Sequence, residues 1–341
     1  MKKVVGFGDF LLRLNPEGYL RFSQADRMMT YYTGAEANVC VSLSTMGVKT
    51  EFVTRVPDND IARAGLMQLR KHGVDVEHVV FGGERLGVFY VEKGASQRPS
   101  KVIYDRKYTS IATAKPADFC WDVLLQDAGW LHITGITPAL GEHLPEICLE
   151  AMRTAREQGV AVSCDLNYRK KLWTSQQAGS VMGEILKYVD VLVANEEDCA
   201  KVLGICAPDT DVEAGKLSRE GYISVARQVC QRFPNLRAVA ITLRGSISAS
   251  DNEWAAMLYT QGEAHFSRQY HVHIVDRVGG GDSFAAGLIY AMGHGFDAQR
   301  SIEFAAAASC LKHSMEQDYN LATVEEVLTL MDGDGSGRVQ R

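Results

Sequence analysis

The chain has 341 residues, a length that suits one large α/β domain or two smaller domains. Its 46% hydrophobic and 23% charged residues are ordinary for a globular protein. A formal net charge of −6 gives no basic excess of the kind that favours nucleic acid as a partner. The first apolar run, Val4-Val5, is too short for a signal peptide or a membrane span. We therefore expect a cytoplasmic protein without a nucleic-acid or membrane partner.

The cysteines and histidines give little indication of disulfides or metal sites. No two of the eight cysteines form a Cys-x-x-Cys pair, and most lie in apolar segments, which predicts buried free thiols. His271 and His273 share a strand face, but no third ligand lies at a useful spacing, so zinc is not expected.

The first part of the chain mixes helices with short strands. Its apolar periodicity predicts strands at 4–7, 51–56, 86–92 and 101–105, and helices at 35–46 and 60–71. Two segments, about 10–34 and 84–112, do not alternate between strand and helix in the regular way. We expect these two segments to form a small β-sheet lid.

From residue 130 onward, strands and helices alternate regularly. Strands are predicted at 130–134, 160–165, 189–194 and 238–243, helices at 143–158, 178–187, 218–233, 282–294 and 298–313, and a hairpin at 254–259 and 264–270. The strands are apolar on both faces, which predicts a mostly parallel sheet covered by helices on both sides. We expect residues 1–331 to form a single domain and the glycine-rich residues 332–341 to form a flexible tail.

The most informative segment is Asp276-Arg277-Val278-Gly279-Gly280-Gly281-Asp282-Ser283-Phe284. Three glycines leave a bare turn, and the apolar residues that follow predict a buried helix. Unpaired N–H groups at a helix N-terminus form an anion site. Asp282 would repel that anion, but it fits a base that takes a proton from a hydroxyl beside a phosphoryl group. The alternative is a structural turn in which Asp282 caps the helix.

Other polar residues also sit where α/β sheets bind ligands. Asp9 and Arg169 follow predicted strands, at their carboxyl ends. Tyr104 and Arg106 are two residues apart and share one face of a lid strand, where they could grip a flat carboxylate. The alternatives are a turn aspartate and solvated arginines.

The glycine loop resembles the D-T-x-G-A-G-D-x-F signature of the ribokinase-like (PfkB) sugar kinases, with Arg277 in place of Thr and Gly280 in place of Ala. The resemblance covers nearly the whole chain, including Gly34-Ala35-Glu36-Ala37-Asn38 and Asn195-Glu196-Glu197-Asp198. Within this family the chain is most similar to kinases of 2-keto-3-deoxygluconate. The resemblance implies an α/β three-layer sandwich with a mostly parallel central sheet and a small β-sheet lid.

The resemblance also implies roles for single residues. Asp282 would be the catalytic base, and Gly279, Gly280 and Gly281 would form the anion hole. The predicted sugar-binding residues are Asp9, Gly34, Asn38, Tyr90, Tyr104, Arg106 and Arg169, of which the two arginines would hold the acid group.

The nucleotide side follows from the same resemblance, which implies ATP and Mg²⁺ and leaves a monovalent cation open. The predicted ATP contacts are Asn195, Thr242, Arg244, Gly245, Gly279 and Gly281, although Arg244 could equally be solvated. The family pattern N-x-x-E serves magnesium, often through water, but here Asp198 stands in the Glu position and Glu197 could replace it.

Together these features predict ATP-dependent phosphorylation of a sugar acid, with 2-keto-3-deoxy-D-gluconate converted to its 6-phosphate. Two arginines are more than a neutral sugar needs. The alternatives are a fructokinase or another neutral-sugar kinase, a nucleoside kinase, and a non-catalytic sugar-binding regulator. The lid strands would leave exposed edges, so a homo-oligomer formed through the lid is also expected.

Overall fold

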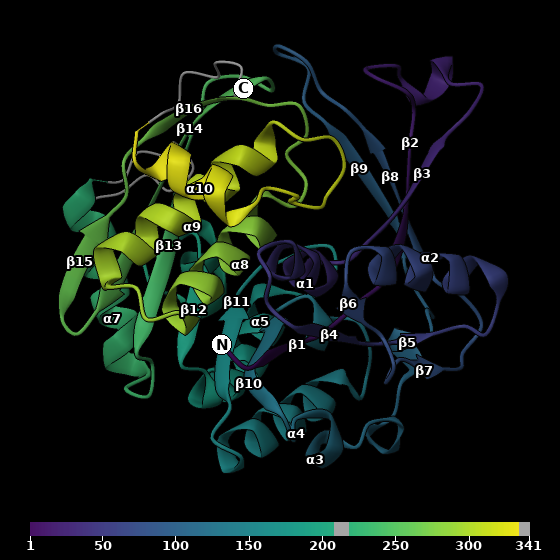
Figure 1. Cartoon of the computed structure of the whole chain (residues 1–341), viewed down its shortest axis with the longest axis horizontal. Coiled ribbons are helices and arrows are strands. Elements are labelled where there is room, and N and C mark those ends of the chain that lie inside the picture. Colours follow the sequence, from purple (N-terminus) through teal and green to yellow (C-terminus); the bar gives the residue numbers. More distant parts are fainter. Residues whose placement is uncertain (208–217, 334–341) are drawn as a thin grey trace.

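A large mixed sheet forms the centre of the molecule (Figure 1). The computed structural model describes residues 1–207 and 218–333, so residues 334–341 of the predicted tail lie outside the described chain. Ten strands pair in the order β15-β14-β13-β12-β11-β10-β1-β4-β6, with β16 also on β14. The parallel part comprises β1 (Lys3–Phe7), β4 (Thr50–Val53), β6 (Val74–Asp75), β10 (Ala128–Thr134), β11 (Ala161–Asp165), β12 (Val191–Ala194) and β13 (Ala238–Ser246). One edge is antiparallel, with β14 (Asp251–Thr260), β15 (Glu263–Phe266) and β16 (Tyr270–His273).

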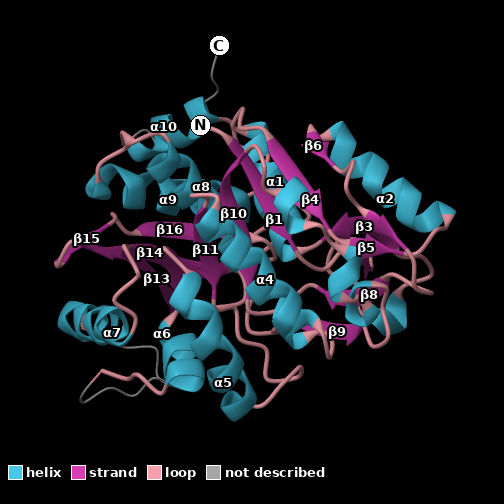
Figure 2. Ribbon diagram, turned by 90° about the horizontal axis from the view of Figure 1, so that it is seen from below, coloured by secondary structure: helices cyan, strands magenta, loops and turns pink. Residues whose placement is uncertain are grey.

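Helices cover both faces of this sheet (Figure 2). One face carries α3 (Trp121–Leu124), α4 (Leu144–Glu157), α5 (Ser175–Ile185) and α7 (Arg219–Arg232), and the other carries α1 (Ala35–Thr45), α8 (Gly280–Gly293), α9 (Ala298–His313) and α10 (Val324–Met331). A separate apolar cluster fills the space on each face. Helix α2 (Asp60–Lys71) flanks β6 at the sheet edge. The predicted three-layer α/β sandwich is therefore confirmed.

A second, four-stranded sheet lies to one side of the first, with the order β3-β2-β8-β9 (Figure 1). Its strands are β2 (Leu11–Asn15), β3 (Met29–Thr33), β8 (Gly87–Glu92) and β9 (Lys101–Asp105). They come from the two segments that were predicted to depart from the regular alternation. Among the described residues, no helix combines the length and the apolar character needed to span a bilayer.

Two predicted strands were too long, and one helix was missed. The strand at 51–56 divides at Thr54, because β5 (Arg55–Val56) leaves the central sheet to pair with β7 (Val80–Phe81). The strand at 264–270 divides at Ser267, whose hydroxyl accepts a hydrogen bond from Ala256 N (3.0 Å) and so interrupts the ladder. Helix α10 was not predicted, although Thr323 and Glu326 form a capping box at its start.

Each of the two histidines on β16 has a carboxylate neighbour. His273 Nδ1 lies 2.7 Å from Asp251 Oδ1, and His271 Nδ1 lies 3.2 Å from Glu253 Oε1. The eight cysteines are free, but only Cys40, Cys148, Cys164 and Cys199 are buried, so the prediction of buried thiols holds for half of them.

The first turn of α1 is fixed to the central sheet by a buried carboxylate. Glu36 Oε1 accepts hydrogen bonds from Thr134 N (2.9 Å), Thr134 Oγ1 (2.8 Å) and Thr137 Oγ1 (2.7 Å). Burial raises the pKa of Glu36 to about 7, against these hydrogen bonds. A Cβ on Gly8 would lie 2.0 Å from Glu36 Oε2, so only glycine leaves room for this carboxylate. The start of α1 is thereby held beside the end of β1.

We expect Gly8→Ala to destabilise the protein by about 1–3 kcal/mol, because the methyl group would push Glu36 out of its three hydrogen bonds. Urea unfolding measures this loss. The matched control is Gly183→Ala in α5, where a Cβ would meet nothing within 4 Å. That substitution should gain up to about 1 kcal/mol from helix propensity. Equal stability of the two variants would contradict the packing argument.

Candidate active site

A cavity of about 970 Å³ lies over the carboxyl ends of β11, β12 and β13 and is faced by the small sheet. It brings together most of the residues predicted for the site. Those that line it are Gly34, Asn38, Tyr104, Arg106, Arg169, Asn195, Glu197, Thr242, Arg244, Gly245, Gly279, Gly280, Gly281 and Asp282. Residues from distant parts of the chain thus meet where ligands of open α/β sheets bind.

The glycine loop has a backbone that only glycine can adopt at its first position. Gly279 has φ +84°, and a Cβ there would lie 2.0 Å from the carbonyl oxygen of Asp318. Helix α8 begins at the next residue. Within the described chain, the N–H groups of Gly281 and Asp282 have no carbonyl partner. These two donors and the positive end of the helix dipole can bind an anion.

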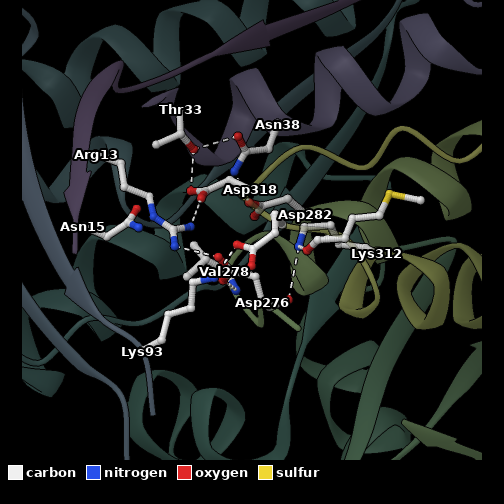
Figure 3. Close-up of polar contacts among 12 residues, drawn as sticks. Arg13, Asn15, Thr33, Asn38, Lys93, Asp276, Val278, Asp282, Lys312 and Asp318 are labelled. Carbon is white, nitrogen blue, oxygen red and sulfur yellow. Dashed lines mark hydrogen bonds and ion pairs between the residues drawn. The ribbon is translucent and has the colours of Figure 1, made fainter. Parts of the chain in front are cut away.

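Asp282 lies in the first turn of α8 and faces the cavity (Figure 3). Its Oδ2 accepts a hydrogen bond from Asn38 Nδ2 at 2.6 Å. The helix cap is Gly279, so Asp282 does not serve as the cap. Burial raises the pKa of Asp282 to about 7, while the Asn38 hydrogen bond and the charges of Arg169 and Lys312 act in the opposite direction. A carboxylate with such a pKa is suited to general-base chemistry near neutral pH.

Two further carboxylates lie in this part of the site: Asp165 is within electrostatic reach of Asp282, and Asp198 is within electrostatic reach of Asp165. Asp165 ends β11, and burial, Asp198 and Asp282 raise its pKa well above the usual range. Burial likewise raises the pKa of Asp198 to about 7. The charge of Arg169 opposes all three shifts, so this guanidinium lies within electrostatic reach of all three acids. Sequence analysis had treated Asp165 only as a strand end.

The small sheet contributes an aromatic and cationic face to the cavity. Arg106 is 8% exposed, and its guanidinium carbon lies 4.2 Å from the centre of the Tyr104 ring. Tyr104 stacks on Phe89, with ring centres 5.5 Å apart. The prediction for Tyr90 was wrong by one residue, because Phe89 pairs with Tyr104 across the strands and lines the cavity, whereas Tyr90 points to the other face.

Asp9 lies behind Arg106 instead of on the cavity wall. Its Oδ2 is 3.8 Å from Arg106 Nη1, and the side chain is 2% exposed. Burial raises the pKa of Asp9 to about 6, against the attraction of Arg106. Within the described chain neither carboxylate oxygen of Asp9 has a hydrogen-bond partner.

The opposite end of the cavity carries the residues predicted for the nucleotide. Asn195 caps α6 (Glu196–Asp198), since its Oδ1 accepts from Asp198 N at 2.7 Å. Glu197 is exposed, whereas Asp198 is buried and accepts from Tyr168 N at 3.2 Å. Arg244 is exposed and donates to Ser246 Oγ at 3.2 Å. Of Glu197 and Asp198, Glu197 is therefore the more accessible to a ligand in the cavity.

Sequence analysis missed a polar layer beneath the glycine loop. It comprises Arg13, Thr33, Asp276, Lys312 and Asp318. Asp318 lies in the irregular segment after α9, where no periodicity marks a buried residue. The one sequence signal for Arg13 is its position in β2: residues of this strand alternate between buried and half-buried, and Arg13 is a cation at a buried position.

A family model described as pfkB family carbohydrate kinase matches residues 1–322. The chain belongs to this PfkB family of carbohydrate kinases.

Within the family, the chain is similar to kinases named for 2-dehydro-3-deoxy sugar acids. The crystal structure of 2-dehydro-3-deoxygluconokinase from Thermotoga maritima is 49% identical, with a TM-score of 0.93, over 97% of this chain and 98% of that chain. The 2-dehydro-3-deoxygalactonokinase of Haloferax volcanii is 31% identical over 98% of each chain. The 2-dehydro-3-deoxygluconokinase of Thermoproteus tenax is 28% identical over 91% of this chain and 88% of its own.

We expect the plot of kcat/KM against pH to rise through a limb near pH 7, since Asp282 must lose its proton to act as a base and its pKa is raised to about 7. The profile is measured with saturating ATP. Asp282→Asn should lower kcat by at least about 10²-fold while ATP still binds, as measured by calorimetry. An active Asp282→Asn variant would contradict the assignment of the base.

Proposed function

We propose that the protein transfers the γ-phosphoryl group of ATP to the terminal hydroxyl of 2-keto-3-deoxy-D-gluconate, giving the 6-phosphate and ADP. One observation carries the proposal: Asp282 and the glycine loop share a single cavity with Arg106 and Arg169. The same cavity thus holds a candidate base, an anion site and two cations that could bind the carboxylate of an acidic substrate. Three similar kinases named for 2-dehydro-3-deoxy sugar acids support the same substrate class.

In the proposed reaction, Asp282 takes the proton of the terminal hydroxyl as that oxygen attacks. The hydrogen bond from Asn38 orients the carboxylate toward the cavity. The N–H groups of Gly281 and Asp282 hold the migrating phosphoryl group. Such donors are fixed by the fold before the reaction, so they meet the developing charge without a cost of reorganisation.

The sugar acid is held between the small sheet and the start of α1. We assign its carboxylate to Arg106 and Arg169, with Tyr104 stacking against the flat keto-acid end. Gly34 and Asn38 would bind hydroxyl groups. Asp9 lies behind Arg106 and would act on the substrate through the charge that it places 3.8 Å from that guanidinium.

The other end of the cavity fits ATP and Mg²⁺. Asn195, Thr242, Arg244 and Gly245 line it there and would contact the nucleotide. Glu197 would hold the metal through water, because it is exposed and Mg²⁺ in kinases keeps several waters and uses few carboxylates. When bound, the ion neutralises charge on the ATP phosphates.

A fructokinase activity is the principal alternative. A neutral ketose would leave the guanidinium of Arg106, which is 8% exposed, with Asp9 as its counter-charge at 3.8 Å and without a hydrogen bond to that carboxylate. A substrate anion that also accepts hydrogen bonds would compensate this largely buried cation better, so the cavity favours an acid.

We expect Arg169→Ala to lower kcat/KM for 2-keto-3-deoxy-D-gluconate by about 10²-fold, because a charge-assisted contact to the carboxylate is lost. ADP release is measured with this acid, with its C4 epimer and with fructose. Arg106→Ala should show the same selectivity. The matched control is Arg153→Ala, which removes an exposed arginine on α4. If both site variants lose acid and fructose activity equally, the arginines do not act as a carboxylate clamp.

We also propose that the outer face of the small sheet pairs with a second copy of the chain. The centre of this face is apolar and half-exposed, with Leu12, Leu14, Val88, Tyr90 and Ile103 on paired strands, and Asp105 lies at its border. The same patch on two copies is self-complementary, as a two-fold dimer requires.

Ile103 is 52% exposed, and Ile103→Glu should therefore shift the protein from dimer to monomer in sedimentation velocity, because it places a charge in the apolar patch. The control is Val123→Glu on α3, where a valine is 52% exposed and the helix lies far from the small sheet (Figure 1). A wild-type protein that is monomeric at micromolar concentration would contradict the dimer.

A further inference from the structure

Arg13 is the largest side chain in the described chain that is fully buried. It lies on β2, in the middle of the small sheet, and no described residue of the glycine loop is close to it in sequence. Taking a guanidinium out of water is costly and rarely benefits stability alone. A position of this kind therefore calls for a functional explanation.

The guanidinium bridges two carboxylates from other parts of the fold (Figure 3). Its Nη2 donates to Asp276 Oδ2 at 2.6 Å, and its Nη1 forms an ion pair with Asp318 Oδ1. Each carboxylate is only 3% exposed at its side chain. Because a planar guanidinium presents several donors in a fixed fork, it sets the distance between its two partners.

One arm of this bridge leads to the glycine loop. Asp276 Oδ1 accepts a hydrogen bond from Val278 N at 3.1 Å, directly before Gly279. The carbonyl oxygen of Asp276 accepts from Lys312 Nζ at 3.2 Å. Asp276 is therefore held through its carboxylate and through its backbone, and the turn that starts α8 depends on it.

The other arm leads to Asp282. Thr33 Oγ1 lies 2.6 Å from Asp318 Oδ2 and 2.8 Å from Asn38 Oδ1. Asn38 Nδ2 in turn donates to Asp282 Oδ2 at 2.6 Å. A continuous series of short contacts thus runs from the buried guanidinium to the carboxylate that faces the cavity.

Arg13 also belongs to the sheet face that was assigned to the substrate. It pairs in register with Phe89, which pairs with Tyr104 on the next strand. Paired residues share one face of a sheet, so Arg13, Phe89 and Tyr104 project in the same direction. One side chain therefore joins the part of the sheet that grips the sugar acid to the loop and base that act on its other end.

We propose that Arg13 is a positioning residue for phosphoryl transfer, which sets the small sheet, the glycine loop and Asp282 in one fixed arrangement. The inference rests on the proposed role of Asp282 as the base. It also implies a charge balance, since the cations Arg13 and Lys312 offset the anions Asp276 and Asp318 beneath the site.

Asp282 is surrounded by four charged groups: Asp165, Asp318, Arg169 and Lys312. Among them, Asp318 raises the pKa of Asp282, behind the larger effect of burial. Removal of the guanidinium leaves the charge of Asp318 less compensated. The acid limb of the pH profile should then move to higher pH.

Two variants separate geometry from charge. Arg13→Lys keeps the charge but loses the fork, so kcat should fall by about 10-fold to 10²-fold while the acid limb stays in place. Arg13→Met loses both the charge and the fork of donors. Its kcat should therefore fall further, and the acid limb of its pH profile should move to higher pH. KM for ATP should change little in both. The control is Arg85→Met, which removes an exposed ion pair with Asp105 on the same sheet and should leave kcat and the limb unchanged.

The inference is overturned if Arg13→Lys has the kcat of wild type, or if Arg13→Met loses activity only in proportion to its folded fraction. Circular dichroism and thermal melting measure that fraction. If Arg13→Met does not fold, Arg13→Lys alone decides. An active Asp282→Asn variant overturns both the base and this inference. Arg13 variants that behave like wild type, beside an inactive Asp282→Asn, overturn this inference only.

Discussion

The site depends on keeping a carboxylate beside a place built for anions. The N-terminus of α8 favours an anion, and Asp282 lies in its first turn. In the proposed reaction an ionised Asp282 repels the phosphoryl group that it approaches, and burial already disfavours its charge. The hydrogen bond from Asn38 and the cations of Arg169 and Lys312 oppose these effects and bring the pKa of Asp282 to about 7 instead of leaving it far higher. A base with that pKa is ionised in a useful fraction of molecules at neutral pH, yet it is still able to accept a proton.

This balance needs exact placement, which the fold provides through buried polar contacts instead of apolar packing. Glu36 fixes the start of α1, and hence Asn38, to the end of β10. Arg13 fixes the turn before α8 through Asp276. Each contact buries a charged or polar group, and each has partners that make burial tolerable. Gly8 and Gly279 provide the space, because a Cβ at either position would lie 2.0 Å from a neighbouring oxygen.

The layers of the fold and much of the cavity wall could be predicted from the sequence. The alternation of apolar strands and helices predicts the central sheet, and the three glycines before Asp282 predict the anion site, because both signals are local. Contacts between distant segments carry no such signal. Asp318 follows α9 in an irregular stretch, and its partner Arg13 is 305 residues away. Strand register is also weakly specified, and for this reason Tyr90 was expected where Phe89 lies. Ser267 divided a predicted strand through a single side-chain hydrogen bond, which no pattern of apolar residues could indicate.

Arg169 connects the two halves of the proposed reaction. Its charge acts on Asp165, Asp198 and Asp282, so in the protein alone it serves as counter-charge to an acidic group of side chains. In the proposed complex it also faces the carboxylate of the sugar acid. Its Nη1 already donates to the carbonyl oxygen of Tyr168 at 3.0 Å, so part of its side-chain entropy is lost before the substrate arrives. A neutral sugar would gain nothing from this preorganised charge. The preference for an acidic substrate and the ionisation of Asp282 would then both depend on the guanidinium of Arg169. Substrate binding would in this way be coupled to the state of the base.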